Sequence, residues 1–185
     1  MPITIKTKKD IENIRIAGQK AAAVLNMLDK YVVPGITTEE LDKIAFDYIT
    51  RDLKCIPANV GYNGYPKTLC TSLNSVICHG IPSESQTLKD GDILNIDVTV
   101  IENKWHGDTS KMYAVGKIQN FAKRLIDVTQ ECMYQGIKKV RPGEKLGTIG
   151  SAIQKHAENN HYSVVRDYCG HGIGKVYHEE PQVLH

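Results

Sequence analysis

Two aspartates on neighbouring predicted strands are the residues of this sequence best placed to do chemistry. Asp97 lies within the apolar run 93–101, and Asp108 lies within the run 105–113. The link between the runs, Glu102-Asn103-Lys104, is short and polar, so the two runs predict a β-hairpin. A turn centred on Glu102 and Asn103 would place Asp97 directly opposite Asp108, with their Cβ atoms roughly 5 Å apart.

The alternation of the first run puts its aspartate on a polar face. One face carries the apolar residues Leu94, Ile96, Val98 and Val100, and the other carries Asn95, Asp97 and Thr99. Two ionised carboxylates at this distance repel, so the pKa of one must rise unless a cation lies between them. The pair therefore predicts a divalent metal site. The alternative is a pair of solvent-facing aspartates on an ordinary hairpin.

Three histidines stand in settings that could present an imidazole to a ligand. His171 lies among glycines in Cys169–Gly174, His79 precedes a glycine in Cys78–Pro82, and His178 follows seven residues after His171. Glycine allows the backbone to approach a ligand closely. A single histidine is more often a core or surface residue, and that interpretation stays open for each of the three. The remaining histidines have no supporting pattern and are expected to be structural: His106, His156, His161 and His185.

Two pairs of predicted helices must position these residues. Apolar spacing predicts a helix over 8–30, and Thr37 with Glu40 forms a capping box that opens a second helix after Pro34-Gly35. The same order returns in a helix over about 119–139, a second Pro-Gly pair and another helix. The repetition predicts two copies of one unit, about 8–115 and 118–185, within a single domain spanning 1–185.

Composition narrows the class of protein. The chain has 185 residues and a formal net charge of +2, too small to indicate binding to nucleic acid or an anionic membrane. No apolar run approaches the length of a membrane helix, and nothing at the N-terminus resembles a signal peptide. The five cysteines are odd in number and show no CxxC spacing, which favours free thiols in a reducing compartment. A cytoplasmic protein is expected.

These motifs, in this order, resemble those of the type I methionine aminopeptidases. The segments that carry the resemblance are Gly61–Pro66, Val76–Pro82, Asp92–Val98, His106–Ser110, Tyr168–Gly174 and His178–Pro181. The resemblance implies the α/β pita-bread fold, with an antiparallel-rich sheet flanked by two helix pairs in a pseudo-twofold arrangement. It implies a monomeric cytoplasmic enzyme that removes the initiator methionine from nascent polypeptides or peptides, with ribosome association as a further partner of the family.

The resemblance also implies roles for individual residues. Asp97 and Asp108 would bind two divalent ions (Co, Mn, Fe(II) or Zn), with Asp108 bridging both and His171 binding one. His79 and His178 would contact the substrate as catalytic histidines. The pocket for the methionine side chain would be lined by Tyr62, Tyr65, Cys70 and Tyr177, whereas Asn59 departs from the family pattern in that wall.

The family's metal site includes two further glutamates beyond residue 185, and Glu179 and Glu180 do not match them. The sequence therefore predicts a form truncated at its C-terminus, lacking the last strands, that binds metal weakly and has little activity. Two alternatives remain open. One is a proline-specific peptidase of the same fold, and the other is an inactive truncated or peptide-binding form.

Overall fold

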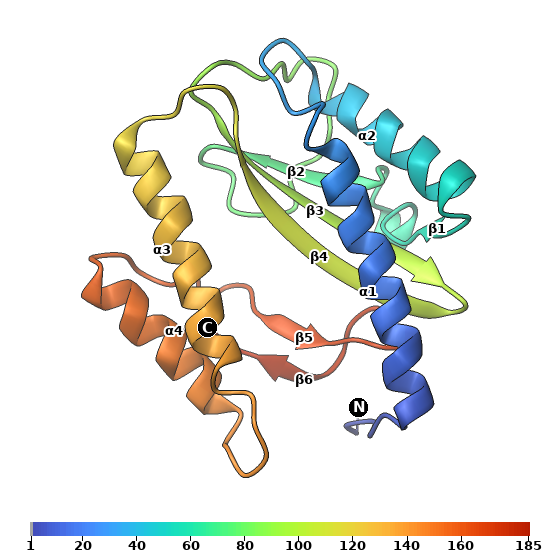
Figure 1. Ribbon diagram of the computed structural model, residues 1–185, viewed down its shortest axis with the longest axis vertical. Coiled ribbons are helices and arrows are strands. Elements are labelled where there is room, and N and C mark those ends of the chain that lie inside the picture. The colour runs from blue at the N-terminus through green and yellow to red at the C-terminus, as the bar shows by residue number, and fades with distance from the viewer. Residues whose placement is uncertain (1) are drawn as a thin grey trace. The chain divides into compact units, whose positions relative to one another are not determined.

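The computed structural model describes residues 2–185, which form two compact units (Figure 1). The N-terminal unit comprises Ile5–Gln119 together with the short segment Ile173–Tyr177. The C-terminal unit comprises Asn120–Gly172 and His178–His185, together with the first residues of the chain up to Thr4. Each unit is described separately below.

The N-terminal unit contains two helices, two short helical turns and four strands. In chain order these are α1 (Lys8–Leu28), α2 (Thr38–Asp47), the π-helical turn η1 (Tyr48–Asp52), β1 (Ile56–Pro57), the 3-10 turn η2 (Tyr62–Gly64), β2 (Leu69–Leu73), β3 (Ile93–Glu102) and β4 (Trp105–Ala114). Both helices begin at capping boxes. The Thr37–Glu40 box at α2 confirms the prediction, and Thr7 with Asp10 forms a second box at the start of α1.

The four strands form an antiparallel sheet centred on β3. β1 and β2 pair with one edge of β3, and β4 pairs with the other edge. The β3–β4 loop consists of Asn103 and Lys104 alone, and both have positive φ, at 49° and 71°. Positive φ at both central residues is the requirement of a type I′ turn, the hairpin turn whose twist matches that of the strands.

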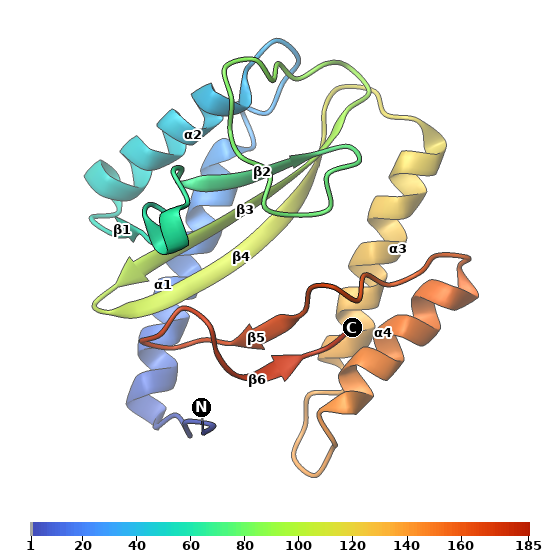
Figure 2. The ribbon, with the colours of Figure 1, turned by 180° about the vertical axis from the view of Figure 1, so that it is seen from behind.

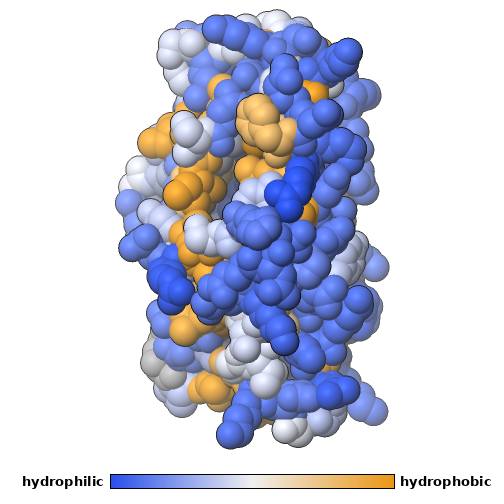
Figure 3. Space-filling model, turned by 90° about the vertical axis from the view of Figure 1, so that its left-hand side faces the viewer, coloured by the Kyte–Doolittle hydropathy of each residue, from blue (hydrophilic) through white to orange (hydrophobic). Residues whose placement is uncertain are grey.

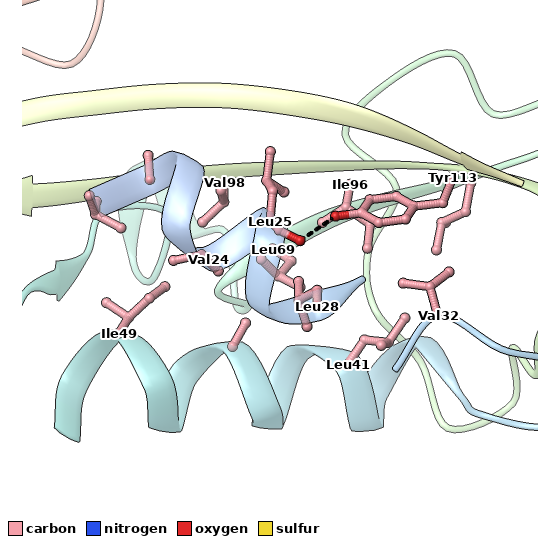
Figure 4. Packing of buried hydrophobic residues seen from close by; sticks show 14 of the residues in the cluster. Val24, Leu25, Leu28, Val32, Leu41, Ile49, Leu69, Ile96, Val98 and Tyr113 are labelled. Atoms are coloured by element: carbon pink, nitrogen blue, oxygen red, sulfur yellow. Dashed lines mark hydrogen bonds between the residues drawn. The ribbon is translucent and has the colours of Figure 1, made fainter. Parts of the chain in front are cut away.

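One face of this sheet is covered by α1 and α2 (Figures 1 and 2). Leu94, Ile96, Val98 and Val100 of β3 point into the core with no exposed surface, as the sequence predicted for this face. Figure 4 shows them packing with residues of both helices, and the hydroxyl of Tyr113 donates a 2.7 Å hydrogen bond to the carbonyl of Leu25. The opposite face of β3 is therefore the one that carries the polar residues.

α1 crosses β4 at a glycine. A Cβ placed on Gly107 would collide with the backbone of Ala17. The helix can pack this closely on the strand because Gly107 has no side chain. This packing supports the strand immediately before Asp108.

The C-terminal unit contains α3 (Asn120–Ile137), α4 (Gly147–Asn159), β5 (Gly170–Gly172) and β6 (Glu179–Val183). Both predicted helices are confirmed, and they pack through Val128, Cys132 and Ala157. Several large apolar side chains of α3 stay exposed, among them Phe121 and Ile137. Figure 3 shows one face of the molecule, on which hydrophobic residues in orange interrupt a mostly hydrophilic surface.

None of the helices within residues 2–185 has both the length and the apolar character needed to cross a membrane. All five cysteines are free thiols, as the sequence predicted: Cys55, Cys70, Cys78, Cys132 and Cys169.

Candidate metal and peptide site

Asp97 and Asp108 share the polar face of the β3–β4 hairpin, but they do not face each other directly. Asp97 pairs with Ser110, and Asp108 pairs with Thr99. The predicted register was wrong because the turn is centred on Asn103 and Lys104, one residue later than expected. The two aspartates are instead diagonal neighbours on one face, a spacing that side chains can still bridge.

The two carboxyl groups interact strongly despite the diagonal spacing. Burial and the neighbouring Asp108 carboxylate raise the pKa of Asp97 to about 7. The ionised form of Asp97 is therefore disfavoured while both oxygens lack a positive partner. Such a pair is unfavourable as a purely structural feature, because two acceptors are held together at the expense of their charge.

A divalent cation fits this pair chemically. Carboxylate oxygens are hard ligands, and a positive charge between them would remove the repulsion that disfavours ionised Asp97. Within residues 2–185, however, no three His, Cys, Asp or Glu side chains converge in a metal-binding arrangement. The N-terminal unit thus contributes a two-carboxylate part of a site.

Asp108 is also held by a hydroxyl directly opposite. Thr99 Oγ1 donates a 2.9 Å hydrogen bond to Asp108 Oδ1. Thr99 has no exposed surface, and its hydroxyl also lies 2.5 Å from the hydroxyl of Tyr177. The sequence analysis placed Thr99 on the polar face but gave it no role. The signal that could have found it is its position two residues from Asp97 on the same face of the strand.

Aromatic rings gather beside this face. The rings of Tyr62 and Tyr177 lie 4.7 Å apart, and the ring of His106 stacks on Tyr177 at 5.4 Å. Asn59 is buried behind them and accepts a 2.6 Å hydrogen bond from the Tyr177 hydroxyl. The Gly61–Pro66 loop is thus an aromatic wall rather than a plain turn.

His106 has the structural role that was expected of it. It is buried, and both its backbone N–H and its Nδ1 lie near the carbonyl of Gly174, at 2.9 and 3.0 Å. These contacts fix the Ile173–Tyr177 segment on β4 and hold the Tyr177 ring in place.

Tyr65 and Cys70 lie on the other side of Asp97. Cys70 pairs with Asp97 across β2 and β3, so both side chains point to the same face. Burial raises the pKa of the Cys70 thiol to about 11, which keeps it neutral and thiol-like near neutral pH. Tyr65 aims its hydroxyl at the carbonyls of Leu69 and Gly80, at 2.8 and 3.0 Å.

His79 lies in a strained loop that β2 holds down. Its φ is 57°, in the left-handed region that non-glycine residues rarely adopt. The next residue, Gly80, is bonded on both sides: its carbonyl accepts from Thr71 N at 2.7 Å, and its N–H donates to Ser72 Oγ at 3.2 Å. Strain of this kind persists only where the surroundings over-determine the conformation, and it is common at functional sites.

His171 and His178 lie in the C-terminal unit, on and beside the β5–β6 hairpin. Their ring centroids are 4.2 Å apart, and His171 Nδ1 lies 2.9 Å from the carbonyl of Gly172. A Cβ on Gly172 would collide with the backbone carbonyls of Glu179 and Glu180, so glycine is required for this pairing. The glycines around His171 therefore serve the close approach of two strands. The hairpin brings the two histidines together.

The sequence and the fold are both similar to known proteins. Residues 12–185 match metallopeptidase family M24. The whole chain is 60% identical to the methionine aminopeptidase of Salmonella typhimurium (strain LT2) and 56% identical to that of Escherichia coli (strain K12), and it spans 70% of the length of each.

Solved structures agree with this similarity. The methionine aminopeptidase of Rickettsia prowazekii superposes with a TM-score of 0.97 at 52% identity, over 99% of this chain and 73% of that one. The X-Pro aminopeptidase of Thermotoga maritima superposes with a TM-score of 0.80 at 18% identity, over 97% of this chain and 49% of that one, and so shares the fold. These matches confirm the expected α/β pita-bread fold class. The chain therefore belongs to metallopeptidase family M24, among the methionine aminopeptidases.

Proposed function

We propose that this protein hydrolyses the peptide bond that follows an N-terminal methionine, using divalent metal ions held by Asp97, Asp108 and His171. The observation that carries the proposal is the buried, mutually repelling Asp97–Asp108 pair, which burial and charge leave in need of a cation. Relatives that are 47–60% identical over the whole chain and are called methionine aminopeptidase support the substrate.

Two ions are proposed, drawn from Mn, Fe(II), Co and Zn. Oxygen and imidazole ligands suit these metals better than they suit a soft ion. When bound, such ions lower the pKa of a bound water and polarise the scissile carbonyl. The chain's own part is to fix the two carboxylates, which the β3–β4 hairpin does by placing both on one face.

His79 and His178 are proposed to act on the peptide itself. His79 would hydrogen-bond the substrate at the scissile amide, and the strained, tied-down loop that carries it supports a fixed placement of the ring. His178 would stabilise the carbonyl oxygen as negative charge develops during attack.

The methionine side chain is proposed to lie against Tyr62, Tyr65, Cys70 and Tyr177. The hydroxyls of Tyr65 and Tyr177 are already engaged with backbone and side-chain acceptors. Their ring faces are therefore the surface left for an unbranched thioether, which packs well against aromatic rings. Asn59 does not oppose this pocket, because its amide is occupied by Tyr177 and Thr68.

The partners follow from this substrate. Nascent polypeptides carry the N-terminal methionine, so we place the protein in the cytoplasm, where ribosome association would bring it to its substrate. Five free thiols support a reducing compartment.

Metal binding is tested first. Mn(II) titrated by calorimetry into the chain should bind to the wild type and lose most of its affinity in Asp97→Asn and Asp108→Asn. Asp29→Asn is the matched control, because it removes a carboxylate that pairs with Lys111 on the surface. Equal binding by all four proteins would overturn the proposed site.

Substrate class is tested with peptides in the presence of Mn(II). Release of methionine from Met-Gly-Met, without cleavage of an Ala-Pro peptide, supports the proposal. Preferential cleavage of the Ala-Pro peptide would show the proline-specific alternative instead. Peptide binding that persists in Asp97→Asn, with no hydrolysis by the wild type, would show a peptide-binding module.

A further inference from the structure

A continuous chain of hydrogen-bonding groups leads from Asp108 into the aromatic wall. Asp108 Oδ1 accepts from Thr99 Oγ1 at 2.9 Å, and Thr99 Oγ1 lies 2.5 Å from the Tyr177 hydroxyl. The Tyr177 hydroxyl in turn donates to Asn59 Oδ1 at 2.6 Å, and Asn59 Nδ2 donates to the carbonyl of Thr68 at 2.8 Å. All of these groups lie in the N-terminal unit.

The far end of the chain is fixed. A backbone carbonyl can only accept, so the Thr68 carbonyl determines which way the Asn59 amide points. Asn59 Oδ1 must then face Tyr177. Asn59 is 5% exposed and Thr99 is fully buried, so water does not compete for either side chain.

The Tyr177 ring is fixed as well. Tyr62 packs on it at 4.7 Å and His106 stacks on it at 5.4 Å. The Gly174 carbonyl, three residues before Tyr177, is held by His106. The hydroxyl of Tyr177 therefore stays at one place between Thr99 and Asn59.

The near end is where this rigidity acts. A threonine hydroxyl rotates freely unless a partner fixes its oxygen. The contact with Tyr177 occupies one side of Thr99 Oγ1 and leaves its hydrogen directed at Asp108. One lone pair of Asp108 Oδ1 is thereby occupied, which restricts the directions in which the carboxylate can bind a cation.

We propose that Thr99, Tyr177 and Asn59 form a positioning relay, in which Tyr177 and Asn59 act through Thr99 to orient the Asp108 carboxylate for metal binding. The relay deepens the proposed function and rests on it for the metal. Tyr177 then has two tasks, because its ring belongs to the methionine pocket and its hydroxyl belongs to the metal site. Partners of this kind around metal ligands typically change metal affinity 10- to 100-fold when they are removed.

The coupling is tested first without metal. In EDTA, the ¹³Cγ resonance of Asp108 is compared between the wild type and Tyr177→Phe, which removes only the hydroxyl. Tyr113→Phe is the matched control, because it also removes a buried hydroxyl bonded to a backbone carbonyl, on the other face of the sheet. We expect Tyr177→Phe alone to move the Asp108 resonance. An unchanged resonance, or an equal change in Tyr113→Phe, would overturn the relay whatever the protein does with metal.

The consequence for metal is tested by Mn(II) calorimetry and by the visible spectrum of bound Co(II). Tyr177→Phe and Thr99→Val should each weaken Mn(II) binding about tenfold and alter the Co(II) spectrum. The double variant should be no weaker than Thr99→Val alone, because Tyr177 acts only through Thr99. Thr99→Ser keeps the hydroxyl and should restore the affinity.

The outcomes separate the two proposals. If the wild type binds no Mn(II) while Tyr177→Phe still moves the Asp108 resonance, the relay stands and the proposed metal site fails. If the wild type binds Mn(II) and the losses of Tyr177→Phe and Thr99→Val simply add, Tyr177 has a merely structural role and the relay fails.

Discussion

The Asp42 carboxylate, on α2, accepts hydrogen bonds from the backbone N–H groups of Thr68 and Leu69, at 2.9 and 2.8 Å. This contact attaches the helix to the first residues of β2, one residue before Cys70. Burial raises the pKa of Asp42, and the two N–H donors oppose that rise by stabilising the ionised form. The carboxylate is thus kept in a costly place because it satisfies two buried donors at once.

Replacing Asp42 should therefore destabilise the sheet. Asp42→Ala leaves two buried N–H groups unpaired, and we expect the free energy of unfolding in urea to fall by about 2 to 4 kcal/mol. Asp42→Asn keeps one acceptor oxygen and should lose less. A loss under about 0.5 kcal/mol in Asp42→Ala would show that water or a shifted backbone satisfies the donors.

Asp97 should make the metal-free protein less stable as the pH rises. Its pKa is raised from 3.8 to about 7 in the folded protein by burial and by Asp108. Between these values the folded state holds a proton that the unfolded state has released, so stability falls with increasing pH across this window. In EDTA, Asp97→Asn should be more stable than the wild type by about 1 to 3 kcal/mol above pH 7.

The difference between Asp97→Asn and the wild type should shrink toward zero near pH 4, where Asp97 is protonated in both states. Urea unfolding at several pH values provides the measurement. A difference that does not depend on pH would show that the substitution acts through packing rather than through the charge.

The local signals in the sequence were sufficient for the helices and for the polar face of β3. Thr37 and Glu40 predicted the start of α2 because a capping box needs only neighbouring residues. The strand alternation likewise placed Asp97 and Thr99 together. The two copies of a repeated unit remain a prediction.

The errors and omissions arose where the conformation depends on tertiary structure or on a weak turn signal. The hairpin register was wrong because Asn103-Lys104 lacks the glycine that usually marks a type I′ turn. The partnership of Asn59 with Tyr177 joins residues far apart in the sequence, so no spacing could have shown it. Neither residue type is unusual in a loop, and only the folded chain brings the amide to the phenol.

Gly80 should be intolerant of a side chain. A Cβ there would collide with the carbonyl of Thr71, which is backbone of β2 and cannot move freely. Gly80→Ala should therefore displace the His79 loop, with a loss of about 1 to 3 kcal/mol in unfolding free energy and a larger loss in kcat than in substrate affinity. The control is Gly18→Ala on α1, where a Cβ meets nothing within 4 Å and should stabilise the helix by about 0.5 to 1 kcal/mol. If Gly80→Ala were as stable and active as the wild type, the loop would not need this close contact.

The β3–β4 turn should be improved by glycine at Lys104. Lys104 has a φ of 71°, which costs a residue with a Cβ but suits glycine. Lys104→Gly should raise the free energy of unfolding by about 0.4 to 1 kcal/mol, even though glycine increases the entropy of the unfolded chain. Ala at the same position serves as the control, because it also removes the lysine side chain but keeps the strain. A gain for Gly over Ala supports the two-residue turn, and with it the register that sets Thr99 opposite Asp108. Equal stability of the two variants would contradict the positive φ and would reopen the alternative in which Asp97 and Asp108 face each other directly.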